Sequence, residues 1–143
     1  MNYVFPSRDW ADRYKSELNQ SEAYRTAAST WHHGAIAFVV HPDPDLGLPD
    51  GFCLWLDVDG GTCRGAREVS IEKARQAPFC LVAPYSRWKK VIERRLDPIA
   101  GMVTRQLVLE GDLLTMMRYV RSAKAMVQCA TRVPSTFLAP VTS

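Results

Sequence analysis

The sequence predicts an α+β fold in which helices cover one face of a five-stranded, mainly antiparallel sheet. Three observations support this prediction. The order of expected elements is ααβββαβααβα, and its three consecutive strands suit an antiparallel meander. Asp59-Gly60-Gly61 joins the second and third strands as a tight turn, because glycine accepts positive φ. A long amphipathic helix follows the fifth strand and must bury its apolar side against the sheet.

Two helices are expected to open the chain. Ser7 suits the N-cap of the first helix. The apolar residues of that helix recur every four positions: Trp10, Tyr14 and Leu18. Asn19 and Glu22 have the spacing of a capping box, which predicts a second helix running to Thr30. Its predicted buried side consists of Ala23, Ala27 and Trp31.

The first three strands occupy the next part of the chain. Residues 34–41 alternate so that one face of the strand carries Ile36, Phe38 and Val40. Residues 41–50 contain three prolines and three aspartates, which is the composition of a loop. The second strand has an inward face made of Phe52, Leu54, Leu56 and Val58. Trp55 is predicted to face the other way.

Short helices flank the fourth strand, P-F-C-L-V-A-P. Ser70 is expected to cap the helix before it, and Ser86 the helix after it. The second of these helices has residues spaced for burial, namely Trp88, Val91, Ile92 and Leu96. Asp97-Pro98 then starts a further short helix, because proline is tolerated at the first helical position.

The fifth strand and the last helix complete the pattern. Residues 104–110 are expected to form the strand, with Leu107 and Leu109 on one face. Gly111 serves as a hinge, and Asp112 caps one amphipathic helix of about 20 residues. Its apolar arc contains Leu113, Met116, Met117, Tyr119, Val120, Ala123, Met126, Val127 and Ala130. The tail that follows is expected to be largely irregular, with Phe137 packed into the core.

Length and composition narrow the class of protein. A chain of 143 residues suits one domain, 1–143 with a core of 6–137, and such a core can enclose a cavity. The formal net charge of +3 does not predict nucleic-acid binding. Four cysteines without a C-x-x-C pair predict free thiols in a reducing compartment. The sequence shows no signal peptide and no apolar run long enough to span a membrane, so we expect a cytoplasmic protein.

Residues that could support catalysis or bind metal are sparse. Adjacent His32 and His33 would point in opposite directions in an extended chain. Asp57-x-Asp59-Gly60 resembles part of a calcium loop, but the required Glu is missing. The sequence has no G-x-S-x-G motif and no evident Cys–His pair. We therefore expect no enzyme activity, no cofactor and no metal site.

The strongest functional signal is the run L-D-P-I-A-G-M-V-T-R-Q-L-V-L-E-G-D-L, followed by a helix bearing Lys and Ala and by V-P-S-T-F. This run resembles the C-terminal half of the sterol carrier protein type 2 family, whose members are small lipid-binding domains. The similarity extends over residues 6–137 and is densest from Trp88 onwards. Where the family typically has Gly-Lys, this chain has Arg105 and Gln106. The resemblance implies an apolar tunnel between sheet and helices that takes fatty acids, fatty acyl-CoA or sterols.

The same resemblance implies which residues line the tunnel. The apolar candidates are Phe38, Val40, Leu54, Leu56, Leu107, Leu109, Leu113, Met116, Met117 and Val120. Lys124 lies within the apolar arc of the last helix and has two interpretations. Its stem either crosses apolar surface to reach water, or its ammonium lies at the tunnel mouth and meets a ligand's carboxylate or phosphate. The basic residues of 87–95 either face solvent or attract an acyl-CoA phosphate or an anionic membrane.

We therefore expect a non-enzymatic protein that binds and transfers apolar lipids. Moving a long chain out of water is favourable by roughly 0.8 kcal/mol per buried methylene. The alternative is an interaction or dimerisation module with a filled core, accessory to a lipid- or steroid-metabolising enzyme. Expected partners are the apolar ligand and a transient anionic membrane surface, without nucleic acid. The sequence is also compatible with association into a homodimer.

Overall fold

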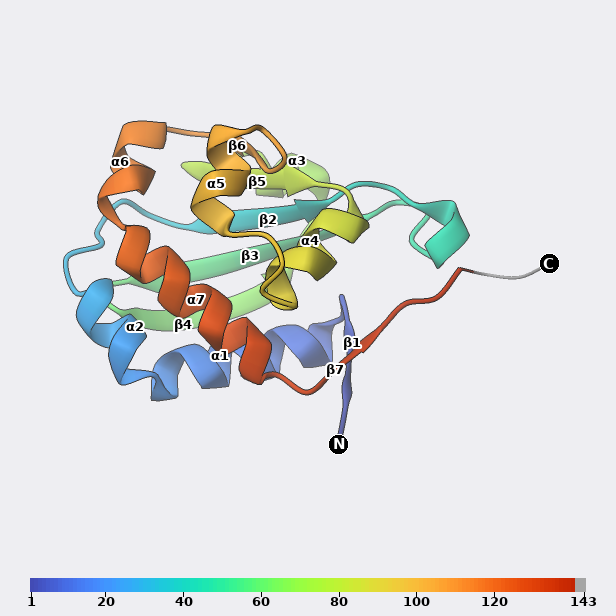
Figure 1. Ribbon diagram of the computed structural model, residues 1–143, viewed down its shortest axis with the longest axis horizontal. Helices are drawn as coiled ribbons and strands as arrows, with labels where there is room; N and C mark the ends of the chain where they lie inside the picture. Colours follow the sequence, from blue (N-terminus) through green and yellow to red (C-terminus); the bar gives the residue numbers. More distant parts are fainter. Residues whose placement is uncertain (141–143) are drawn as a thin grey trace.

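The computed structural model describes residues 1–140. Its elements in chain order are β1 (Tyr3–Phe5), α1 (Arg8–Gln20), α2 (Glu22–Ala27), β2 (Ile36–Val40), the 3-10 helix η1 (Pro44–Leu46), β3 (Phe52–Asp59), β4 (Thr62–Glu68), α3 (Ile71–Ala74), β5 (Phe79–Ala83), α4 (Tyr85–Ile92), α5 (Pro98–Val103), β6 (Val108–Glu110), α6 (Leu113–Arg118), α7 (Val120–Arg132) and β7 (Ser135–Phe137). Figure 1 shows α7 lying across the sheet between α1 and α5.

Five strands form the main sheet, in the order β4-β3-β2-β5-β6. β2 and β5 are parallel at its centre, with Ile36 opposite Phe79. The other three neighbouring pairs are antiparallel. The predicted α+β class and the five-stranded, mainly antiparallel sheet are therefore confirmed.

The two faces of this sheet bury apolar side chains of different size. The larger cluster lies between the sheet and helices α1, α2, α4 and α7, and it contains Leu54, Leu56 and Val58. The smaller cluster lies on the opposite face, where Ala74 of α3 packs near the half-buried Trp55. The predicted orientation of the two faces of β3 is thus confirmed. The apolar cavity described below lies on the side of the larger cluster.

Gly60 and Gly61 form the turn between β3 and β4 as predicted. Their φ angles are 58° and 88°, the pair of positive values that a type I′ hairpin needs. The turn also fits closely against α2. A Cβ atom on Gly61 would lie 2.6 Å from the carbonyl oxygen of Arg25.

We expect Gly61→Ala to lower the free energy of unfolding by about 1–2 kcal/mol from its φ alone, and by more from the clash with Arg25. Gly65→Ala in β4 is the matched control, because its Cβ would meet no atom closer than 3.8 Å. The measurement is the urea midpoint at unchanged m-value. Equal effects of the two substitutions would contradict the close approach of this turn to α2.

Four predicted N-caps accept a hydrogen bond from a first-turn amide: Ser7, Ser70, Asp97 and Asp112. The cap predicted for the second helix is wrong, because Ser21 caps α2 in place of Asn19. Asn19 instead binds β4. Its Oδ1 accepts from the amide of Cys63 at 2.8 Å, and its Nδ2 donates to the carbonyl of Cys63 at 2.9 Å. A tertiary contact has therefore replaced the expected capping box.

Two further helix boundaries differ from prediction. α2 ends at Ala27, before Thr30, and its buried residue is Tyr24 while Ala23 is exposed. α4 begins at Tyr85, so Pro84 occupies the N-cap position and Ser86 lies inside the helix. Proline needs no amide partner there, and its backbone is already extended (φ −69°, ψ 159°).

The predicted single C-terminal helix is wrong, because the chain breaks into α6 and α7 at Tyr119 (φ −111°, ψ 37°). The Tyr119 hydroxyl donates to the carbonyl of Thr30 at 3.0 Å, and its ring packs edge-on against Trp31 at 4.9 Å. Tyr119, which makes these contacts, has backbone angles outside the helical range, so the helix ends there. The break changes which side chains point inward: Met116 is buried, whereas Leu113 and Met117 are exposed.

The ends of the chain hold a pairing that the sequence does not predict. β1 and β7 form a separate two-stranded parallel sheet, with Tyr3 opposite Ser135. The indole of Trp10 donates to the Ser135 hydroxyl at 2.8 Å, which ties α1 to the tail. The half-buried Phe137 packs against Phe5, in line with its expected place at the core. The tail is therefore more ordered up to residue 137 than expected.

The fifth strand is shorter than predicted. β6 spans only Val108–Glu110, in place of the extended segment 104–110 that the sequence predicts. Arg105 adopts a φ of 63°, which interrupts extended geometry before the strand. The segment between α5 and β6 is thus a tight turn, and it carries Leu107 into the core at 1% exposure.

Candidate ligand-binding cavity

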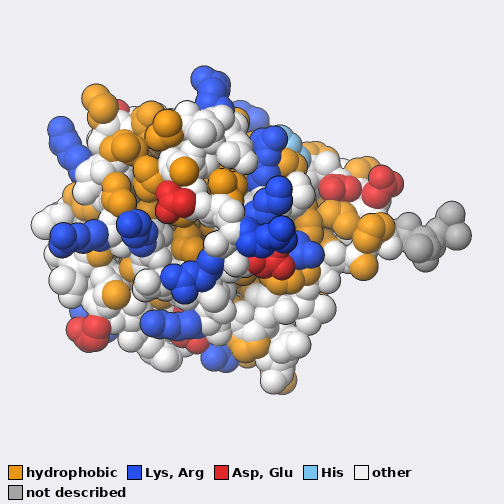
Figure 2. All heavy atoms as spheres, viewed as in Figure 1, with side chains coloured by type: hydrophobic (Ala, Val, Ile, Leu, Met, Phe, Trp, Pro, Cys, Tyr) orange, Lys and Arg blue, Asp and Glu red, His pale blue; other side chains and the backbone are white. Residues whose placement is uncertain are grey.

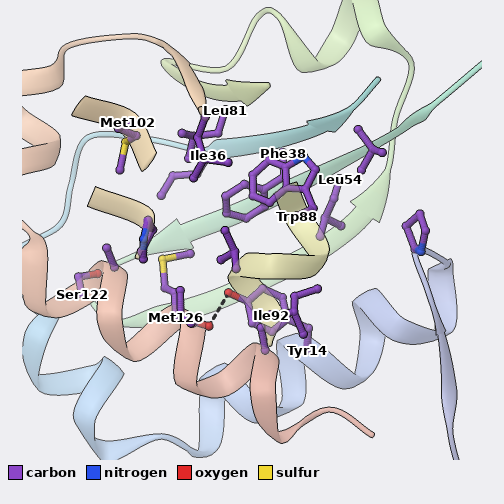
Figure 3. Close-up of a pocket in the computed structure, with 18 of the residues that line it drawn as sticks. Tyr14, Ile36, Phe38, Leu54, Leu81, Trp88, Ile92, Met102, Ser122 and Met126 are labelled. Atoms are coloured by element: carbon purple, nitrogen blue, oxygen red, sulfur yellow. Dashed lines mark hydrogen bonds between the residues drawn. The ribbon is translucent and has the colours of Figure 1, made fainter. Parts of the chain in front are cut away.

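An internal apolar cavity of about 110 Å³ lies between the sheet and the helices that cover it (Figure 3). The sheet contributes alternate residues of three strands, which share one face because side chains alternate along a strand. These residues are Ile36, Phe38, Val40, Phe52, Leu54 and Leu81. The opposite wall comes mainly from helices α1, α2 and α4 to α7.

Tyrosine and tryptophan rings are prominent in the wall opposite the sheet. The residues lining the cavity from α1, α2, the following loop and α4 are Trp10, Tyr14, Tyr24, Trp31, Trp88, Val91 and Ile92. Those from α5 to α7 include Met102, Met116, Ser122, Met126 and Ala130. Three flexible methionines therefore line the space, and methionine adapts readily to ligands of different shape.

Five of the predicted ligand-binding residues line the cavity: Phe38, Val40, Leu54, Leu107 and Met116. Leu56 is fully buried in the larger cluster without lining the cavity, and Leu109 is half-buried in β6. Leu113 and Met117 are each 39% exposed. The break at Tyr119 accounts for these outward positions, since the helical wheel assumes one continuous helix.

Val120 and Lys124 lie elsewhere. Both border a surface groove between α2 and α7, together with Arg118, Arg121 and residues of α2. Lys124 is exposed, and it is not among the residues that line the apolar cavity. The Lys124 side chain therefore lies on the solvent-facing side of α7.

The basic residues of α4 and the following turn also lie outside the cavity. Arg87 donates to the carbonyl of Gln106 at 3.1 Å and so links α4 to the turn before β6. Lys90, Arg94 and Arg95 are exposed. These three side chains are part of the molecular surface at α4 and the turn that follows it.

Sequence reasoning misses the aromatic lining. The spacing of Tyr14 and Trp88 predicts burial, but the pattern of a helix cannot show whether a buried ring meets another side chain or an open space. Trp31 is predicted at the end of a helix, although it follows α2 in a loop. A usable signal is the concentration of Trp and Tyr at inward positions of three separate elements.

Most polar groups around the cavity are already hydrogen-bonded. The Tyr14 hydroxyl donates to the carbonyl of Met126 at 3.0 Å, as Figure 3 shows. The indoles of Trp31 and Trp88 donate to the carbonyls of Gly34 and Val39, each at 2.9 Å. Burial raises the pKa of Tyr14 well above that of an ordinary phenol, so this hydroxyl stays neutral.

The buried thiols are poorly suited to nucleophilic chemistry. Burial raises the pKa of both Cys63 and Cys80 to about 11. A thiol reacts as its thiolate, which is scarce near neutral pH at such a pKa. Within residues 1–140 no three His, Cys, Asp or Glu side chains come together in a way that could hold a metal ion. In the same range, no helix has the length and apolar character needed to cross a membrane.

The size of the cavity limits what it holds without rearrangement. A dry protein cavity of roughly 150 Å³ admits benzene, and sites for drug-sized ligands have about 300–1,000 Å³. A cavity of about 110 Å³ therefore takes a short apolar segment as it stands. A whole lipid requires side chains or cover helices to move.

Comparison with known proteins places this geometry in a family. The profile of the SCP-2 sterol transfer family matches residues 12–124. A crystal structure of sterol carrier protein 2 is 39% identical, with a TM-score of 0.83, covering 89% of this chain and 97% of its own. A solution structure of a conserved hypothetical protein from Thermus thermophilus, named as a possible sterol carrier protein, is 38% identical. Its TM-score is 0.84, covering 95% of this chain and 93% of its own.

Sterol carrier protein 2 from Yarrowia lipolytica, in its apo form, shares the fold at 13% identity and a TM-score of 0.54, covering 85% of this chain and 88% of its own. No curated protein matches the chain in sequence. The family match spans most of the elements that build the cavity, from α1 to the first turns of α7. This chain therefore belongs to the SCP-2 sterol transfer family.

Proposed function

We propose that the protein binds apolar lipids in its internal cavity and transfers them without catalysing a reaction. The observation that carries this proposal is the apolar cavity between the sheet and the helices of an SCP-2 fold. Each methylene moved from water into such a space contributes roughly 0.8 kcal/mol. The energy is non-directional, so the wall need only be apolar and adaptable, as the methionines make it.

Widening the cavity is part of the proposed mechanism. The segment 98–118, which comprises α5, β6 and α6, supplies Met102, Leu107 and Met116 to the wall. Two residues with positive φ, Arg94 and Arg105, lie before it and within it. Short helices joined by such turns can shift with smaller loss of packing than α1 or the sheet, which supports this segment as the cover that yields to a ligand.

Tryptophan fluorescence tests the proposal directly. Trp10, Trp31 and Trp88 line the cavity, whereas the fourth tryptophan, Trp55, lies on the opposite face of the sheet. Long-chain lipids should change the emission with a dissociation constant in the micromolar range. This corresponds to a binding free energy of about −8 kcal/mol. The same change should persist in Trp55→Phe. Unchanged emission, together with no co-purified lipid by native mass spectrometry, would reject the proposal.

The outer side of segment 98–118 suggests how a lipid enters. Large apolar side chains are exposed there: Val103, Val108, Leu113, Leu114 and Met117. Figure 2 shows hydrophobic side chains gathered over α5 and α6, with Lys and Arg side chains among them. In the proposed function this surface rests on a bilayer during exchange, because apolar residues flanked by cations suit an anionic membrane.

Leu114→Asp tests this step. Leu114 is 73% exposed, so the substitution should change the free energy of unfolding by at most about 0.5 kcal/mol. Lipid transfer from anionic vesicles should slow several-fold, since a carboxylate opposes both insertion and the surface charge. Ile71→Asp is the matched control, because Ile71 is an exposed apolar residue of α3 on the opposite face. If both variants transfer lipid at the parent rate, the bilayer contact lies elsewhere.

A further inference from the structure

Three exposed cations line one side of the surface groove between α2 and α7. Arg118 lies at the end of α6, and Arg121 and Lys124 lie close to one turn apart on α7. Figure 2 shows Lys and Arg side chains over α7. The ion pairs found within residues 1–140 all involve other cations of the chain. The charges of these three side chains are therefore available to a second molecule.

Carboxylates that could neutralise these cations are scarce in the groove. Among the described residues that line it, Glu22 is the one acidic side chain, and it is already paired with Arg25 of the same helix. Asp112 lies outside the lining but within the influence of Arg118. Its pKa is lowered first by the hydrogen bond from Thr115, with Arg118 as a smaller cause. The groove thus keeps an excess of positive charge.

The floor of the groove is apolar and built of small side chains. Ala23 and Ala27 contribute from α2, where a spacing of four residues places them on one side of the helix. Val120 and Ala125 contribute from α7. Ala125 is buried, whereas Ala27 and Val120 are half-buried and Ala23 is exposed. Such small side chains leave room for apolar groups of a partner, and an apolar centre with a charged rim is typical of protein interfaces.

Shape and charge together favour a protein segment as the occupant. A bilayer is flat and takes up large apolar side chains, whereas this floor is recessed and consists of alanine and valine. A phosphate group would meet the cations and leave the apolar floor in contact with water. An amphipathic helix with carboxylates one turn apart satisfies both features, because its charges match the spacing of Arg121 and Lys124 and its apolar side covers the floor.

We infer that the groove between α2 and α7 is a docking surface for an acidic amphipathic helix of a partner protein. The carboxylates of that helix pair with Arg118, Arg121 and Lys124, and its apolar side packs on the alanine floor. This interaction goes beyond lipid binding and needs no ligand in the cavity. Tyr119 lines both the groove and the apolar cavity, so a docked partner lies against the wall that encloses the cavity.

A synthetic peptide of about 20 residues tests this inference, with Glu on one side of its helix and Leu and Ala on the other. Its binding to lipid-free protein is followed by the fluorescence anisotropy of a dye on the peptide. The same peptide with Gln in place of Glu should bind at least about tenfold more weakly. The double variant Arg121→Glu/Lys124→Glu should weaken the Glu peptide about tenfold or more, because attraction becomes repulsion.

The matched control is the double variant Lys90→Glu/Arg95→Glu. It has the same net charge as the groove variant, and it changes two exposed cations that do not line the groove. General attraction between the protein and an acidic peptide therefore falls equally in both variants. The control should weaken the Glu peptide by less than about twofold, since exposed charges beyond about 10 Å are largely screened at 0.1 M salt.

Ala23→Trp tests the apolar floor without altering any charge. Ala23 is exposed, so the urea midpoint should stay close to that of the parent. The indole occupies part of the floor on which the apolar side of the peptide rests. The Glu peptide should therefore bind at least about fivefold more weakly, although every cation of the groove remains.

Four results would overturn the inference. The Glu peptide fails to bind, the groove variant and its control lose affinity equally, or Ala23→Trp binds the peptide as tightly as the parent. The fourth is an Arg121→Glu/Lys124→Glu protein that still binds the peptide but no longer binds vesicles of phosphatidylserine and phosphatidylcholine, which would assign the groove to a membrane. Because the peptide is measured on lipid-free protein, none of these results bears on lipid binding in the cavity.

Discussion

Ala130→Phe is expected to abolish lipid binding, with a loss of more than about 100-fold, while leaving the ligand-free protein nearly as stable as the parent. Ala130 lies on α7, is 6% exposed, and lines the cavity beside residues of α1 and α4. A phenyl ring at this position enters space that already exists. The ring gains apolar contacts, so the free energy of unfolding should change by less than about 1 kcal/mol. The same ring removes the volume that a lipid needs.

Ala11→Phe is the matched control for this substitution. Ala11 is a helical alanine of the same cluster, 1% exposed, and it does not line the cavity. Overpacking a filled site of this kind costs typically about 1–3 kcal/mol. The folded fraction should still bind lipid. Urea midpoints and lipid displacement, measured on both variants, give the comparison.

The reverse pattern would support the filled-core alternative. If Ala130→Phe destabilises the protein as much as Ala11→Phe and the parent binds no lipid, the helices pack on a solid interior. The domain would then act through its surface, as an interaction module. A cavity of about 110 Å³ beside Ala130 argues for the first outcome.

Local sequence patterns predict much of the sheet and most helix caps, because both are local in origin. Alternation in β2 and β3 places Phe38, Val40 and Leu54 on the inward face, where the structure has them. Gly60-Gly61 sets the register of the hairpin. In each case one or two residues, or a period of two, carry the information.

Other features depend on contacts between distant parts of the chain. The break at Tyr119 coincides with contacts to Thr30 and Trp31, and no pattern within 112–132 indicates them. The pairing of β1 with β7 joins the two ends of the described chain through strands of three residues each. The cavity itself depends on how closely the two layers approach. Periodicity therefore predicts a shared orientation for Leu54 and Leu56, and cannot tell which of them meets the open space.

Leu56→Ala is expected to lower the free energy of unfolding by about 4–5 kcal/mol while leaving the preference for ligand size unchanged. Leu56 is 0% exposed, belongs to the larger cluster, and does not line the cavity. Truncating a leucine at such a site removes its burial and leaves a new void, and the measured cost of this change spans about 2–5 kcal/mol. Because Leu56 is fully buried among packed neighbours, we expect its truncation to cost an energy at the upper end of this range.

Leu54→Ala is the matched comparison, two residues away on the same face of β3. Leu54 is 5% exposed and borders the existing cavity, so it has fewer neighbours to lose. Its truncation should cost about 2–3 kcal/mol, near the lower end of the range for Leu→Ala substitutions. The new space joins the cavity and should shift the preference towards bulkier ligands. Urea unfolding gives the two energies, and displacement by ligands of increasing girth gives the preference. A shift in ligand size caused by Leu56→Ala and not by Leu54→Ala would place the cavity deeper along β3 than the structure does.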